Sequence, residues 1–191
     1  MTAGRLRDAV QALTAIADGQ PDEPRFLDEA SHVLADLLAH DDWLPARFAQ
    51  PSPDRYQQYL LHCDPWERFC IVSFVWGPGQ HTPVHDHRVW GLIGVLRGAE
   101  RNLSFEPDGD GVLHIVADDL AQPGDIGRVS PTIGDVHQVF NALTDEVSIS
   151  IHIYGGNIGR IERAVFDPEN GTARPFVSRF ANPELPNIWN D

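Results

Sequence analysis

The chain has 191 residues, of which 28 are Asp or Glu and 14 are Arg, with no Lys, so its formal net charge is −14. This charge repels phosphate backbones and anionic headgroups, and no apolar run reaches the roughly 20 residues that span a bilayer, so we expect no nucleic-acid or membrane partner. The start lacks a long apolar stretch and only two Cys are present, which predicts a cytoplasmic protein without a disulfide framework.

The first 45 residues have a helical pattern. Apolar side chains recur every three or four positions over residues 6–17 and again over residues 26–38, and an Asp-Gly-Gln-Pro turn follows the first stretch. The sequence therefore predicts two amphipathic helices. We expect residues 1–45 to form a helical segment packed on the remainder of a single domain.

From about Arg55 the pattern changes to short β-branched and aromatic runs separated by Gly and Pro. Many short strands at such spacing favour an antiparallel barrel or sandwich over residues 46–191, ending in an extended C-terminal tail. The predicted strands cover residues 69–76, 89–96, 113–116, 125–129, 136–140 and 147–154.

Three histidines are spaced as metal ligands. His85 and His87 are two residues apart, so on a strand both imidazoles would reach one metal while Asp86 turns away. His137 follows a Gly turn and opens a predicted strand, which makes it the best candidate for a third ligand. Three imidazoles suit Fe(II), Zn, Cu and Ni, and a zinc site that activates water is an alternative. Exposed strand histidines without a metal are the other alternative.

The segment from Ser148 to Tyr154 alternates polar and Ile side chains. Ser150, His152 and Tyr154 therefore share one face of a strand, and three Ile share the other. By pattern alone, this describes a half-buried strand with its polar side in water.

Two motifs resemble those of the cupin family, and the resemblance covers about residues 56–163. The first cupin motif usually has a Glu ligand after its second His, but Gly91 and Leu92 stand at those positions here. Three His without a carboxylate are similar to the cysteine dioxygenase branch of the cupins. The two matching spacings are Gly79-x5-His85-x-His87 and Gly134-x2-His137-x3-Asn141.

This resemblance implies a mainly β cupin barrel (a double-stranded β-helix, or jelly roll) with N-terminal helices, and the activity of an Fe(II)-dependent thiol dioxygenase. It also implies that Ser150, His152 and Tyr154 form a catalytic hydrogen-bonded relay beside the iron, inside the barrel. Some members crosslink this Tyr to a Cys placed where the chain has Gly91, so we expect an uncrosslinked tyrosine. A divalent metal lowers the pKa of a bound thiol, which suits thiolate chemistry.

The resemblance also bears on the substrate. Gln58, two residues after Tyr56, stands where cysteine dioxygenases have Arg, and this Gln type is similar to bacterial 3-mercaptopropionate dioxygenases. In those proteins an Arg nine residues after the relay Tyr binds the substrate carboxylate, and Arg163 holds that position. A guanidinium matches a carboxylate well. Without the resemblance, a surface Gln and a surface Arg paired with a neighbouring acid are the simpler interpretations.

The sequence thus predicts an iron enzyme that oxidises 3-mercaptopropionate with O2 to 3-sulfinopropionate. Its partners would be a small anionic thiol and O2. One alternative is a cysteine dioxygenase that forms cysteine sulfinic acid. A second alternative, from another class, is a non-catalytic cupin that binds a metal or a small ligand, because one fold supports many functions.

Overall fold

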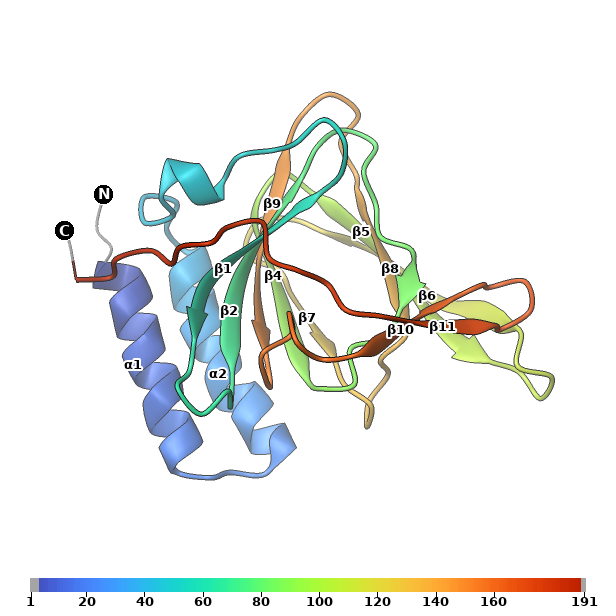
Figure 1. Cartoon of the computed structure of the whole chain (residues 1–191), viewed down its shortest axis with the longest axis horizontal. Coiled ribbons are helices and arrows are strands. Elements are labelled where there is room, and N and C mark those ends of the chain that lie inside the picture. Colours follow the sequence, from blue (N-terminus) through green and yellow to red (C-terminus); the bar gives the residue numbers. More distant parts are fainter. Residues whose placement is uncertain (1–3, 190–191) are drawn as a thin grey trace.

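The computed structural model describes residues 4–189, and two helices begin it (Figure 1). They are α1 (Gly4–Asp18) and α2 (Glu23–Leu38), close to the predicted ranges. Asp22 caps α2, because its carboxylate accepts a hydrogen bond from the Arg25 amide at 3.2 Å, and a proline lies in the first turn. None of the described helices is long and apolar enough to cross a membrane.

Two antiparallel sheets form the body of the molecule. The first has five strands in the order β1-β2-β9-β4-β7. Its members are β1 (Gln57–Cys63), β2 (Cys70–Trp76), β4 (Gly91–Arg97), β7 (Ile126–Val129) and β9 (Ser148–Tyr154). A short 3-10 helix, Ala46–Phe48, precedes this sheet in the chain.

The second sheet has six strands in the order β11-β10-β3-β8-β5-β6. Five strands of the two sheets, β1, β3, β5, β10 and β11, were not predicted; β3 has only two residues, and β5 has charged side chains near both ends. The members of this sheet are β3 (Val84–His85), β5 (Glu100–Pro107), β6 (Leu113–Ala121), β8 (His137–Asn141), β10 (Arg163–Phe166) and β11 (Ala173–Phe176).

The helices cover the outer face of the five-stranded sheet. The three isoleucines of β9 are buried in the same apolar cluster as the inward faces of α1 and α2. Gly94 of β4 permits this close packing, because a Cβ there would lie 2.5 Å from a methyl carbon of Leu38. Burial of this apolar surface fixes the sheet, and with it the opposite face of β9, relative to the helices.

The C-terminal segment after β11 runs along β1 (Figure 1). The Ala181 amide donates to the Gln58 carbonyl at 2.7 Å, and the Asn182 side chain bonds both the amide and the carbonyl of Leu60. The segment therefore caps the edge strand of the five-stranded sheet, and it forms one wall of a cleft described below.

Candidate metal centre and adjoining pocket

His85, His87 and His137 come together in the interior of the barrel. Each offers one ring nitrogen, these nitrogens lie within 4.8 Å of one another, and all three residues are buried. His85 of β3 pairs directly with His137 of β8. His87 lies beyond the end of β3, so the strand-face argument for this pair was wrong in detail; a left-handed Arg88 (φ 61°) follows it.

Each imidazole is oriented through its Nδ1 atom. With Nδ1 bonded to an acceptor, the Nε2 atom carries the lone pair that a metal needs. The Nε2 atom of His87 is buried and has no hydrogen-bond partner, which an apolar core would not tolerate without cost. The three Nδ1 partners are the Pro83 carbonyl at 3.0 Å for His85, Asp135 at 3.0 Å for His87 and Asn102 at 2.6 Å for His137.

The electrostatics of the cluster favour neutral imidazoles. Burial lowers the pKa of His85 and His137 well below the ordinary value, and the neighbouring imidazoles act in the same direction. For Asp135, burial acts to raise the pKa, but hydrogen bonds from His87 and from backbone amides hold it below its usual value. Neutral His85 and His137, together with the unpartnered Nε2 atom of His87, fit a divalent metal ion.

Gly91 leaves no room for a side chain beside the cluster. It pairs with Tyr154 across β4 and β9, and a Cβ at this position would lie 2.9 Å from the Tyr154 ring and 3.0 Å from Val129. A Glu or Cys side chain here would displace the tyrosine. The donor set of the centre is accordingly three imidazoles.

The polar face of β9 forms a buried hydrogen-bonded chain inside the barrel. Ser150 Oγ lies 2.8 Å from His152 Nε2, and His152 Nδ1 lies 2.7 Å from the Tyr154 hydroxyl. The Trp76 indole donates to Ser150 Oγ at 3.2 Å, and Phe74 stacks on His152 with 4.0 Å between ring centroids. Burial lowers the pKa of His152 and raises that of Tyr154, so both side chains are neutral.

Arg163 is buried, with 4% of its surface exposed, although a surface position was the simpler interpretation of its pattern. It opens β10, its guanidinium lies 4.5 Å from the centroid of the Phe176 ring, and it donates to Ser178. Among the described residues it has no acidic partner within ion-pair distance. Its Nε atom and the Oε1 atom of Gln58 are buried without partners.

One small cavity brings these groups together. Its walls include His85, Tyr154, Arg163 and Gln58, and no described residue that lines it is acidic. The remaining lining residues are Tyr56, Phe74, Thr82, Pro83 and Phe176.

An outer cleft of about 650 Å³ shares three walls with this small cavity, those of Tyr56, Gln58 and Phe176. The exposed Arg55 and Arg179 also line the outer cleft. The outer cleft, with its two exposed arginines, therefore adjoins the small cavity that Arg163 lines.

Sequence reasoning missed the residues that hold this site in place. Asp86 turns away from the metal centre as expected, but its Oδ1 atom accepts a hydrogen bond from the Ala164 amide at 2.6 Å, which ties the His85–His87 loop to β10. Asp135, two residues before His137, lies within one predicted motif and could have been suspected as a partner of a ligand. Asn102 carries no signal in the sequence.

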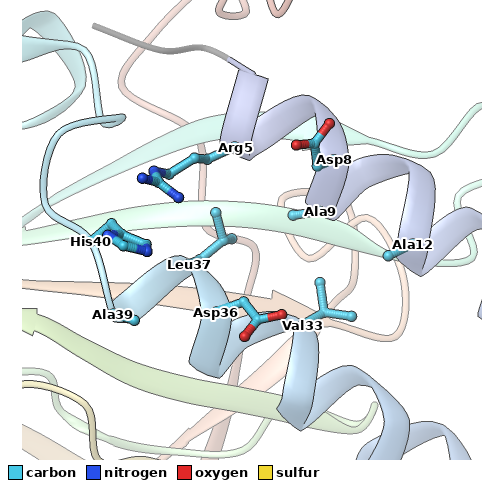
Figure 2. Close-up of a pocket in the computed structure, with 9 residues that line it drawn as sticks. All are labelled: Arg5, Asp8, Ala9, Ala12, Val33, Asp36, Leu37, Ala39 and His40. Atoms are coloured by element: carbon cyan, nitrogen blue, oxygen red, sulfur yellow. The ribbon is translucent and has the colours of Figure 1, made fainter.

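A second cavity, of about 390 Å³, lies between α1 and α2 (Figure 2). Arg5, Asp8, Asp36 and His40 point around it, but Arg5 is already paired with Asp42 at 3.0 Å. The three histidines that could hold a metal ion lie outside this larger cavity.

No protein-family model matches the chain. Among solved structures, it is similar to a double-stranded β-helix protein of Klebsiella pneumoniae, at 17% identity and a TM-score of 0.47, over 71% of this chain and 97% of that one. An RmlC-like cupin of Desulfovibrio desulfuricans has 27% identity and a TM-score of 0.41, over 56% and 88% of the two chains. An oxalate oxidase bound to the substrate analogue glycolate has 16% identity and a TM-score of 0.44, over 55% and 53%.

The expected fold class is confirmed. The chain forms a mainly β barrel of antiparallel strands in two sheets, with two N-terminal helices. Within that barrel it has a buried group of three histidines that could hold a metal ion.

Proposed function

We propose that the chain is a mononuclear non-haem Fe(II) thiol dioxygenase that converts 3-mercaptopropionate and O2 into 3-sulfinopropionate. His85, His87 and His137 would hold the iron through their Nε2 atoms on one side, which leaves further coordination positions open. Bound iron would supply the electron transfer that lets O2 react with a thiol sulfur. Both atoms of O2 enter the product, so the reaction needs no other oxidant or reductant.

The observation that carries this proposal is the shared cavity of His85, Tyr154 and Arg163. A guanidinium binds a carboxylate through two parallel hydrogen bonds, so Arg163 would hold the acid end of the substrate with its thiol directed toward the histidines. The described lining has no acidic side chain to pair with an ammonium group. This favours 3-mercaptopropionate over cysteine.

The remaining groups position and attract the substrate. His152 holds the Tyr154 hydroxyl at 2.7 Å, so Tyr154 would orient the reacting group and exchange a proton with it. Arg55 and Arg179 on the outer cleft would attract the substrate carboxylate from solution.

Metal analysis coupled to oxygen uptake tests the proposal. After Fe(II) loading, we expect oxygen consumption with the highest kcat/KM for 3-mercaptopropionate, a lower value for cysteine and a very low value for cysteamine, which has no carboxylate. A clearly higher kcat/KM for cysteine would identify a cysteine dioxygenase instead. Protein that neither binds iron nor consumes O2 with any of these thiols would be a non-catalytic cupin.

The substitution Arg163→Lys tests the carboxylate anchor. Loss of a bidentate, charge-assisted pair costs about 1.5–3 kcal/mol, so KM for 3-mercaptopropionate should rise roughly 10- to 100-fold with the iron content unchanged. Arg160→Lys is the matched control, because Arg160 is exposed and pairs with Glu67 at 3.1 Å. Equal KM values in the two variants would remove Arg163 from the substrate site.

A further inference from the structure

The proposed reaction produces a proton that must leave a buried site. A neutral thiol and O2 give a sulfinic acid, which is ionised at neutral pH, so each turnover releases one proton. Tyr154 is 2% exposed and His152 is 2% exposed, so water has little direct access to either group. The inference below rests on the proposed function and concerns the route of this proton.

Glu100, the first residue of β5, is a buried carboxyl group that the site so far does not use. It is 2% exposed and lies in the barrel interior beside β9. Its Oε1 atom accepts a hydrogen bond from Ser148 Oγ at 3.0 Å, whereas its Oε2 atom is buried without any partner. It has no ion-pair partner among the described residues. A carboxyl in such a position is rarely retained in an apolar core by packing alone.

Glu100 extends the chain of β9 beyond Ser150. The Ser148 hydroxyl donates to its carboxylate at 3.0 Å, and the Ser150 hydroxyl and the Trp76 indole lie close enough to lower its pKa. Together with the contacts of 2.8 Å and 2.7 Å along β9, the order from the small cavity inward is Tyr154, His152, Ser150 and Glu100.

A different cavity, of about 390 Å³, lies at the Glu100 end of this chain. Glu100 lines it from β5, and the charged groups that face it from other elements are Asp119 of β6, Asp125 before β7 and Arg128 of β7. The Arg128 guanidinium is paired with Asp28 at 2.7 Å. From β4 and β8 the lining is apolar, with Val95 and Val139 among it. The hydrogen-bonded groups of β9 and Glu100 therefore lie between the small cavity beside His85 and this separate cavity.

We propose that Glu100 is the terminal acceptor of a proton pathway. The pathway takes the proton of the substrate thiol through Tyr154, His152 and Ser150 and releases it into the cavity that Glu100 and Asp119 line. The S–H bond of the thiol breaks, and the proton moves to the Tyr154 oxygen as the Tyr154 proton moves to His152 Nδ1. The His152 Nε2 proton then moves to Ser150 Oγ, and the Ser150 proton moves to the Glu100 carboxylate. Glu100 is a positioning residue, because it acts through the other three.

The hydrogen-bond pattern agrees with this direction. When Glu100 is ionised, the Ser150 hydroxyl would turn to donate to its unpartnered Oε2 atom, and the Ser150 oxygen would accept from the Trp76 indole and from His152 Nε2. His152 Nδ1 then accepts from Tyr154. When Glu100 is protonated, it donates to Ser150, Ser150 donates to His152 Nε2, and the proton of His152 moves to Nδ1. The protonation state of Glu100 therefore sets the tautomer of His152.

The acidity of Glu100 suits a group that takes up and releases a proton. Burial raises its pKa to about 7, against the opposing hydrogen bonds from Ser150, Ser148 and Trp76. A group whose pKa is close to the ambient pH can both take up and release a proton readily.

Nitrogen NMR of the histidines in the full-length, metal-free protein tests the pathway without any activity measurement. In the wild type we expect His152, assigned with a His152→Gln variant, to change from the Nδ1–H to the Nε2–H tautomer as the pH rises through about 7. Glu100→Gln should hold His152 in one tautomer at every pH, because an amide does not titrate in this range. Asp119→Asn is the control, and the change should persist there.

Ser150→Ala provides a second variant, in which the link is cut while Glu100 remains. The tautomer of His152 should then no longer follow pH. The inference is overturned if a folded wild type shows no change of tautomer near pH 7, or if the change persists in Glu100→Gln or in Ser150→Ala.

Kinetics give an independent readout. In the iron-loaded wild type, kcat/KM for 3-mercaptopropionate should rise roughly tenfold between pH 6 and pH 8, and Glu100→Gln should have a low and flat profile with normal iron content. Asp119→Asn should keep the wild-type profile. If the wild type consumes no O2 with any thiol while the tautomer change is observed, the proposed function fails and the Glu100–His152 linkage stands. If activity is normal and its profile is unchanged in Glu100→Gln, the pathway fails and the function stands.

Discussion

The hydrogen bonds of individual ring nitrogens define the candidate metal centre more clearly than the presence of three histidines alone. The Nδ1 atoms of His85, His87 and His137 are all engaged, and the Nε2 atom of His87 is buried without a partner. The ring orientations are therefore set by the protein itself, before any cation binds. Such outer partners typically contribute a factor of 10 to 100 in metal affinity.

We expect His137→Ala to remove iron binding while the protein stays folded, because the apolar clusters of the barrel and helices do not include His137. Asn102→Ala should weaken iron binding by roughly 10- to 100-fold, since it frees the Nδ1 atom of His137. Titration with Fe(II) under anaerobic conditions measures both effects. Full iron affinity in His137→Ala would refute the ligand assignment, and Asn157→Ala serves as an unrelated Asn control.

The ligand candidates could be predicted from the sequence, because the spacing of His85 and His87 is local information. The position of His137 beside them also followed, although only from the similar Gly context of the two motifs. Asn102 and Glu100 could not be predicted, since their roles depend on the pairing of β5 with β8 and on the depth of β5 in the barrel. Neither is recorded in the residues around them.

At the level of elements, β9 departs from the usual arrangement of an antiparallel strand. Both of its faces are buried, with isoleucines under the helices and polar side chains inside the barrel. The alternation of the sequence predicted the two faces correctly. By pattern alone the polar face was expected in water, whereas both faces are buried. The reason is that the interior of this barrel contains a polar site, so polar residues point inward.

The contact between β4 and β9 offers a test at this scale. Gly91→Ala places a methyl group about 3 Å from the Tyr154 ring, so the tyrosine must move, and we expect at least a tenfold loss of kcat with iron binding retained. Gly127→Ala of β7 is the matched control, because a Cβ there has only the Ile93 carbonyl near it, at 3.9 Å. Equal activity of the two variants would show that the position of Tyr154 does not matter.

The net charge of the whole molecule and the charge of its cleft have opposite signs. The chain carries −14, yet the outer cleft is lined by Arg55 and Arg179 and adjoins the small cavity that Arg163 lines. A small anion would be repelled by the average surface and attracted at this one opening. Composition predicted the exclusion of polyanions, but this local reversal depends on where the C-terminal segment lies.

The stability of the metal-free protein should fall in acid. His85, His137 and His152 stay neutral in the folded chain, whereas in the unfolded chain each takes up a proton below its ordinary pKa of 6.5. Glu100 acts in the opposite sense, because the folded chain keeps its proton up to about pH 7. Between about pH 4.5 and 6.5 these three imidazoles, and His62, whose pKa burial also lowers, take up more protons in the unfolded chain than in the folded one; they outnumber Glu100, so the free energy of unfolding should decrease as the pH falls.

Urea unfolding at several pH values in this window measures that slope. His152→Gln should reduce it by about 1.4 kcal/mol per pH unit, since one of the three imidazoles is gone. A free energy of unfolding that does not change from pH 6 to pH 5 would contradict the assignment of neutral buried histidines.

The pairing of β3 with β10 has a consequence for molecular recognition. His85 lies opposite Val165, and Asp86 fixes the Ala164 amide, so main-chain bonds hold Arg163 at a set position relative to the metal-binding end. The guanidinium itself is held by the Phe176 ring and by its hydrogen bond to Ser178. The distance between the Arg163 guanidinium and the three histidines is therefore set by the fold. A ligand that contacts both groups would be selected by the number of carbons between its two end groups. A change of preferred chain length would require a different side chain or a different rotamer at position 163.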